Sequence, residues 1–137
     1  MIVSQFQVME KIAGPVCGVF AASIISGKEF SHVFSFTKEA LGRTDGWQGR
    51  MKMSELKKVL SLLDVKWSEL PMSSRQTLKK HISNLEYDTT YLVFITSHFI
   101  TVRNGLYYDQ STPNGAPIEL NKHISSKLVK GIFQIEE

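Results

Sequence analysis

The sequence predicts an α+β fold in which a helical amino-terminal half packs on a small antiparallel β-sheet. Apolar residues recur at helical spacing through the first half of the chain, whereas β-branched and aromatic residues dominate from Thr89 onward. The pair Asn104-Gly105 separates two of these β-like runs, as in tight antiparallel hairpins. Helices first and strands second favour α+β over alternating βαβ units. A length of 137 residues is enough for one hydrophobic core, so we expect a single domain over residues 1–137.

The first helix is expected between Gly14-Pro15 and Gly27, over the apolar block from Val16 to Ile25. Proline near the start and glycine after the end are typical helix punctuation. The block has no polar stripe, so protein should surround this helix on most sides. We therefore expect it to be the central helix of the domain, with Cys17 at its beginning.

Two further helices are expected over residues 31–41 and 54–63, each with a serine as its cap. The polar, glycine-containing stretch 43–50 between them should form an ordered loop. A short extended piece at 65–67 and a short helix at 75–82 complete the helical half.

Strands are expected over residues 90–96, 99–103 and 106–109, where β-branched and aromatic side chains follow one another. A fourth strand is expected within the apolar run 128–135, after a turn or short helix near 121–126. Together these strands would form the antiparallel sheet.

The Asn104-Gly105 turn predicts how the second and third strands pair. A type I′ turn needs positive φ at both central residues, which asparagine and glycine tolerate. If Arg103 lies opposite Leu106, then His98 and Asp109 share one face of the sheet as diagonal neighbours, with backbones about 7 to 8 Å apart. An imidazole and a carboxylate can bridge that separation. We therefore expect Asp109 to accept a hydrogen bond from His98 and to fix its tautomer and orientation.

Cys17 is the only cysteine of the chain, so it has no partner for an internal disulfide. One interpretation is a small buried hydrophobic residue, which the neighbours Val16 and Val19 favour. The other is a nucleophile, because the helix dipole and a nearby imidazolium both lower the pKa of a thiol at a helix amino terminus. The pairing of His98 with Asp109 leads us to expect the nucleophile.

The order of these groups resembles the papain-like cysteine peptidase superfamily, in which a cysteine opens the central helix and a histidine and its partner follow on strands. The segments that carry the resemblance are CGVFAASIISGKEFSHVFSFTKEALGR, DGWQGR, SELKKVLSLL and TTYLVFITSHFITVRNGLYYDQS. They look like parts of compact papain-like proteins of phages and bacteria, and SHFITVRNGLYYD is the most specific piece. The resemblance implies a papain-like fold and a triad of Cys17, His98 and Asp109 that acts on a protein or peptide through a thioester acyl-enzyme.

Papain-like enzymes usually stabilise the oxyanion with a glutamine or asparagine side chain about six residues before the nucleophile. That position is Lys11 here, so Gln7 and Gln5 are the candidate oxyanion residues, and Gln48 is a remoter one. Trp47 and Gln48, in the DGWQGR loop, are candidates to line a substrate groove. Trp47 could equally be a hydrophobic plug that anchors the loop.

Three alternatives stay open. Asn114 could replace Asp109 as the third member of the triad, although TPNG is more simply a turn. The chain could be a catalytically inactive papain-like module that binds a protein, with Lys11 marking a lost oxyanion hole. The same triad could also serve an acyltransferase or a transglutaminase-like enzyme.

Composition excludes several other classes. Hydrophobic residues make up 42% and charged residues 21%, as in globular proteins, and no apolar run is long enough to cross a bilayer. The net charge of +3 comes without a long basic block, so we expect neither nucleic acid nor a membrane as partner. His32, His81 and His123 have no cysteine or carboxylate at metal-ligand spacing, so we expect no metal or cofactor. The amino-terminal residues lack the pattern of a secretory signal, which favours the cytoplasm, or the host cytoplasm for a phage-encoded chain.

Overall fold

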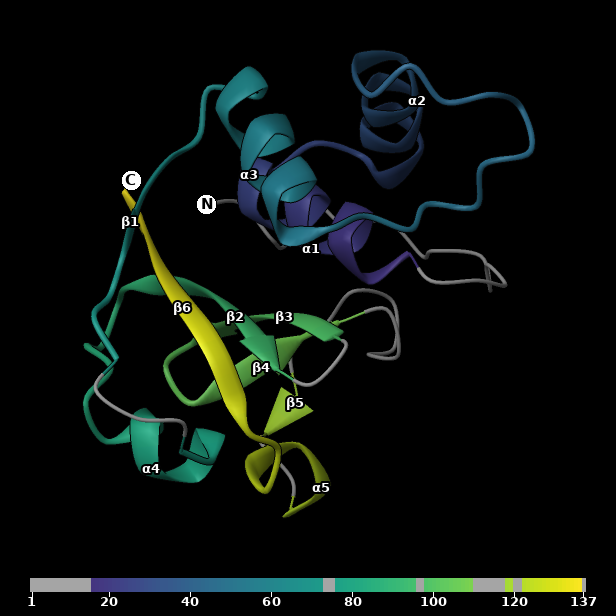
Figure 1. The fold of residues 1–137 in the computed structure, drawn as a ribbon. Coiled ribbons are helices and arrows are strands. Elements are labelled where there is room, and N and C mark those ends of the chain that lie inside the picture. The colour runs from purple at the N-terminus through teal and green to yellow at the C-terminus, as the bar shows by residue number, and fades with distance from the viewer. Residues whose placement is uncertain (1–15, 73–75, 96–97, 110–117, 120–121, 137) are drawn as a thin grey trace.

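The computed structural model describes residues 16–72, 76–95, 98–109, 118–119 and 122–136. It is an α+β structure, in which three helices precede an antiparallel sheet (Figure 1). The described elements are α1 Cys17–Ser26, α2 Phe30–Ala40, α3 Met53–Leu62, β1 Lys66–Glu69, α4 Leu78–Ile82, β2 Thr90–Ile95, β3 His98–Arg103, β4 Leu106–Tyr108, β5 Ile118–Glu119, α5 Lys122–Ser125 and β6 Val129–Glu136. The expected α+β class is therefore confirmed.

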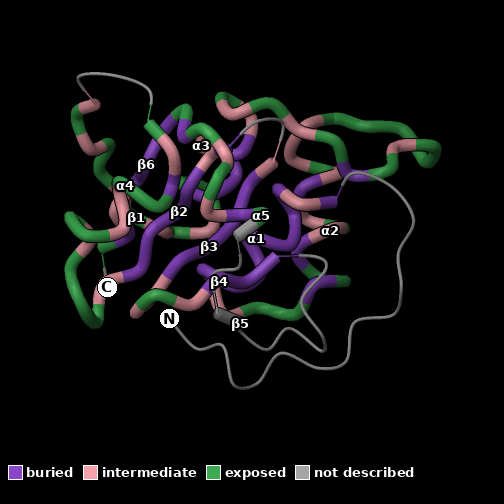
Figure 2. Tube along the Cα trace, turned by 90° about the horizontal axis from the view of Figure 1, so that it is seen from below, coloured by how far each residue is buried: buried purple, intermediate pink, exposed green. Residues whose placement is uncertain are grey.

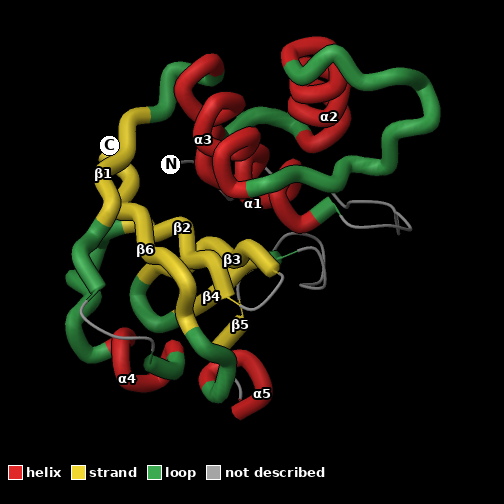
Figure 3. The backbone as a smooth tube through the Cα atoms, in the orientation of Figure 1, coloured by secondary structure: helices red, strands yellow, loops and turns green. Residues whose placement is uncertain are grey.

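The described strands form one sheet in the order β1-β6-β2-β3-β4-β5, and every neighbouring pair is antiparallel. Strand β6 lies between β1 and β2, so the last strand of the chain is inside the sheet. Helices α1, α2 and α3 cover one face, whereas the short helices α4 and α5 lie on the other side (Figure 3).

Helix α1 is the central helix, as the sequence predicts. It contacts α2, α3 and strand β3, and residues 18–25 are all buried. Gly27 ends the helix in the left-handed conformation at φ +75°, and its N–H donates to the carbonyl of Ser23. The absence of a polar stripe in this segment thus follows from its burial on several sides.

Both faces of the sheet are buried, so its central strands are apolar without alternation (Figure 2). In β2, Leu92 faces the core under α1, α2 and α3, whereas Tyr91 and Val93 face the second core, which Leu78 of α4 and Ile124 of α5 cover. This double burial explains the continuous run of β-branched and aromatic residues there.

The predicted serine caps are wrong. The residues that precede α2 and α3 are Glu29 and Lys52, and both serines, Ser31 and Ser54, lie inside the first turn. At α3 the N–H of Lys52 donates to the carboxylate of Glu55 at 2.9 Å, so an acceptor from within the helix satisfies it.

The other boundaries differ by a few residues. A helix was predicted over residues 75–82, and α4 begins only at Leu78. The helix does not start earlier because Thr77 is extended and forms a β-bridge with Leu128. Strand β4 ends at Tyr108, one residue before the predicted end, so Asp109 directly follows the ladder.

Candidate active site

The hairpin between β3 and β4 has the predicted turn and register. Asn104 and Gly105 have φ of +55° and +77°, as a type I′ turn requires. Arg103 lies opposite Leu106, and the ladder continues to Thr101 opposite Tyr108. The side chain of Asn104 also accepts a hydrogen bond from the N–H of Asp88 at 2.6 Å. The turn therefore fixes which residues meet at the other end of the two strands.

At that end, His98 and Asp109 form the expected pair. Nε2 of His98 lies 2.8 Å from Oδ2 of Asp109. The carboxylate is buried, with 4% of its side chain exposed, and 27% of the imidazole is exposed. Because Asp109 occupies Nε2, the other ring nitrogen, Nδ1, is left for a second partner.

The second partner is Cys17, at the first position of α1. Its side chain is hydrogen-bonded to His98, and its sulfur also accepts from the backbone N–H groups of Phe99 and Gly18. Burial raises the pKa of the Cys17 thiol, but these hydrogen bonds and the charge of His98 outweigh it and hold the pKa below the ordinary value of 9.0. The site therefore stabilises a thiolate.

The pKa of His98 moves in the opposite direction. Burial lowers it, but hydrogen bonds to Asp109 and Cys17 and their charges raise it to about 9, from an ordinary 6.5. The pKa of Cys17 is lowered and that of His98 is raised, so both shifts favour the charged forms, a thiolate and an imidazolium. Such a pair is a nucleophile together with the acid that the leaving group needs.

Two close contacts between the start of α1 and the loop before α3 help to position Cys17. Gly49 has φ +108°, and a Cβ there would lie 2.8 Å from Cγ1 of Val16, the residue before Cys17. A Cβ at Gly18 would lie 2.8 Å from the terminal methyl carbon of Met51. The loop before α3 thus packs directly on the start of α1. The sequence does not predict these contacts, because a glycine permits a close approach without indicating which segment approaches it.

Trp47 anchors this loop. Its ring lies 5.2 Å from that of Phe34 between centroids, and its Nε1–H donates to the carbonyl of Arg50 at 3.0 Å. Trp47 is half-buried, whereas Gln48 is exposed. These contacts fix the ring of Trp47 against α2 and its own loop. A role of Trp47 or Gln48 in a substrate groove stays a prediction.

Several predicted residues lie outside the described part of the chain. These are the candidate oxyanion residues Gln5 and Gln7, Lys11, and the alternative triad residue Asn114. Their roles stay predictions.

Within the described residues, no group of three or more His, Cys, Asp or Glu side chains could hold a metal ion. Among the same residues, no helix combines the length and the apolar composition that a membrane crossing requires.

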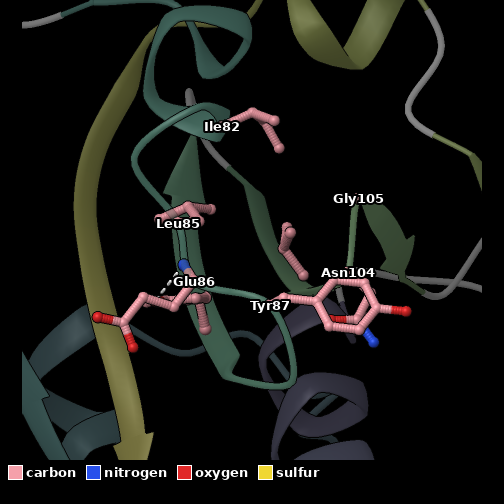
Figure 4. Close-up of a pocket in the computed structure, with 8 residues that line it drawn as sticks. Ile82, Leu85, Glu86, Tyr87, Asn104 and Gly105 are labelled. Carbon is pink, nitrogen blue, oxygen red and sulfur yellow. Dashed lines mark hydrogen bonds between the residues drawn. The ribbon is translucent and has the colours of Figure 1, made fainter.

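A pocket lies near the opposite end of strand β3 from His98 (Figure 4). Its wall includes the turn residues Asn104 and Gly105 and the half-buried Leu85, and Tyr87 stands at its side with 76% of its surface exposed. No cysteine or histidine lines it. The pocket is therefore separate from the group formed by Cys17, His98 and Asp109.

Comparison of the chain with models of known protein families found no match, and comparison with curated proteins found none either. Its function is therefore inferred from the geometry around Cys17.

Proposed function

We propose that this chain is a papain-like cysteine hydrolase, a small peptidase or isopeptidase that uses Cys17, His98 and Asp109 as its catalytic triad. The observation that carries the proposal is the 2.8 Å contact of the His98 imidazole with the buried Asp109 carboxylate, beside a cysteine whose pKa is lowered by hydrogen bonding to the same imidazole. A central helix that begins with the cysteine, beside an antiparallel sheet that carries the other two residues, supports the papain-like assignment.

In the proposed reaction the Cys17 thiolate attacks the carbonyl carbon of an amide. The tetrahedral intermediate collapses to a thioester as the imidazolium of His98 gives its proton to the departing amine. His98 is then neutral and takes a proton from water, which attacks the thioester and releases the acid and the thiolate. Asp109 holds the ring through Nε2 during both steps, so that Nδ1 stays aimed at the sulfur.

The oxyanion would form at the amino terminus of α1. The N–H of Cys17 belongs to the first turn of this ten-residue helix, where backbone N–H groups have no acceptor within the helix. We propose the side-chain amide of Gln7 or Gln5 as the second donor. A reducing cytoplasm, which in an infected cell is that of the host, would keep the Cys17 thiol unmodified.

Alkylation of Cys17 by iodoacetamide between pH 5 and 10 tests this proposal. We expect Cys17 to react near pH 7 at least about tenfold faster than in the urea-unfolded chain, because an ordinary thiol is mostly protonated there. His98→Ala should remove most of this advantage. His32→Ala, which changes an exposed histidine on α2, should not.

Equal rates in the folded and unfolded chain, with no effect of His98→Ala, would contradict a catalytic Cys17. A fast, His98-dependent alkylation without cleavage of any member of a peptide library would favour the inactive binding module. Addition of an amine nucleophile separates the remaining classes, since a hydrolase releases acid while an acyltransferase or transglutaminase-like enzyme forms the new amide.

A further inference from the structure

Two phenylalanines extend from the nucleophile across the sheet. Phe94 of β2 pairs with Phe99 of β3, and their rings stack with centroids 4.7 Å apart. Phe99 touches the site directly, since its N–H donates to the Cys17 sulfur and its ring would lie 3.6 Å from a Cβ at Gly18. Phe99 is buried and Phe94 is half-buried, so part of Phe94 is accessible to solvent. We call Phe94 and Phe99 the aromatic shelf.

A lysine lies at the outer end of the aromatic shelf. Strand β6 pairs Gly131 with Phe94 and Val129 with Ile95, so the intervening Lys130 has no residue opposite it and forms a bulge. Its Nζ lies 5.7 Å from the centroid of the Phe94 ring, and its side chain is exposed. Bulges of this kind redirect a side chain and are common beside active sites.

The charge of Lys130 is not neutralised by any carboxylate of the described residues. The contrast is Lys57, which also lies over aromatic rings but pairs with Glu69 at 3.6 Å. A cation–π contact leaves the ammonium free to donate to an anion, because the aromatic ring carries no charge. Lys130 is thus a cation in contact with the shelf that leads to Cys17.

We propose that the aromatic shelf and Lys130 select peptides with an acidic side chain close to the scissile bond. An apolar group of the substrate would rest on the edge of Phe94, and an Asp or Glu would meet the ammonium of Lys130. An extended chain advances about 3.3 Å per residue, so peptides with the acidic residue one to four positions from the scissile carbonyl sample about 3 to 13 Å along the aromatic shelf. The inference rests on the proposed function and names its substrate class.

Pairs of peptide vinyl sulfones test the inference. The two members of a pair are identical except that one of these positions carries Glu in the first probe and Lys in the second. The rate of Cys17 labelling is followed by intact-mass spectrometry at low ionic strength. We expect the best Glu probe to react about three- to tenfold faster than its Lys counterpart. The reason is that Glu attracts the exposed ammonium of Lys130 whereas Lys repels it, and each interaction between exposed charges is weak. Salt near 1 M should bring the two rates together, because the Debye length is then about 3 Å.

Lys130→Glu should reverse the preference, and Lys130→Gln should bring the ratio close to one. The matched control is Lys79→Glu, which makes the same charge change at an exposed position of α4, on the other side of the sheet. A wild-type ratio near one, or a ratio that Lys130→Glu leaves unchanged, would overturn the inference. In either case a fast, His98-dependent alkylation by iodoacetamide would still support the proposed function; slow alkylation independent of His98 would remove both.

Discussion

Replacement of Asp109 by asparagine should destabilise the protein most at the pH values where His98 is protonated. Asparagine keeps the shape of the side chain and can still accept the hydrogen bond from Nε2, but it removes the charge that faces the imidazolium. The contact is 2.8 Å long and the carboxylate is 4% exposed, so little water screens the interaction.

The size of the effect follows from the pKa of His98. Folding raises it from 6.5 to about 9, and one pKa unit corresponds to about 1.4 kcal/mol, so the protonated form gains about 3.5 kcal/mol on folding. Because the pKa is raised, this stabilisation is fully present below pH 6.5 and is lost as the pH rises through about 9. Asp109 shares this effect with Cys17, and the hydrogen bond to Asp109 is the largest of the causes that raise the pKa. This hydrogen bond weakens when its acceptor is a neutral amide and not a carboxylate, and the difference between the two kinds of hydrogen bond is about 1 to 1.5 kcal/mol.

Urea denaturation under reducing conditions at pH 6 and pH 10 measures this difference. We expect Asp109→Asn to lower the free energy of unfolding by about 1 to 1.5 kcal/mol at pH 6 and by less than about 0.5 kcal/mol at pH 10. Asp45→Asn is the matched control, because Asp45 is fully exposed in its pair with Lys38 and should show no such change with pH. A deficit for Asp109→Asn that is equal at both pH values would refute the role of the charge.

Two backbone positions yield further predictions that urea denaturation at neutral pH can measure. Gly49→Ala should lower the free energy of unfolding by about 2 to 3 kcal/mol, because φ is +108° and the new methyl group would meet Val16. Gly46→Ala should change it by no more than about 0.5 kcal/mol, because nothing lies within 4 Å of a Cβ at that position. Equal effects of the two would contradict the tight packing at Gly49. Asn104→Ala should lower the free energy of unfolding by about 1 to 2 kcal/mol, because alanine is strained at the positive φ of this turn and cannot form the hydrogen bond with Asp88. Asn104→Gly should lower it by less, because glycine adopts a positive φ without strain.

Local patterns predicted most of the elements, because each is encoded over a few residues. The spacing of Leu56, Val59 and Leu60 predicts α3, and all three are buried. Where a tertiary contact competes with a local preference, the sequence is less informative. Helix α2 begins at Phe30, one residue before the predicted serine, and Phe30 is buried in the core, so burial sets the boundary there. The position of β6 between β1 and β2 has no local signal at all.

The candidate site divides in the same way. The contact between His98 and Asp109 could be predicted because a two-residue turn connects their strands and counting fixes the register. The contact of Cys17 with His98 could only be inferred from family resemblance and chemistry, since it depends on how α1 packs against β3. The bulge at Lys130 was not predicted, because β6 reads as a regular apolar strand.

The members of the proposed triad are consequently positioned by two separate parts of the fold, a β-hairpin and the start of a helix. His98 and Asp109 belong to one hairpin, whose geometry depends on its own turn and ladder. Cys17 belongs to a helix whose first residues are pressed by the loop before α3, through the contacts of Gly49 with Val16 and of Gly18 with Met51. A change in that loop can therefore move the sulfur relative to the imidazole while the imidazole and carboxylate stay bonded. We therefore expect substitutions in this loop, such as Gly49→Ala, to change the rate at which Cys17 is alkylated while the contact of His98 with Asp109 persists.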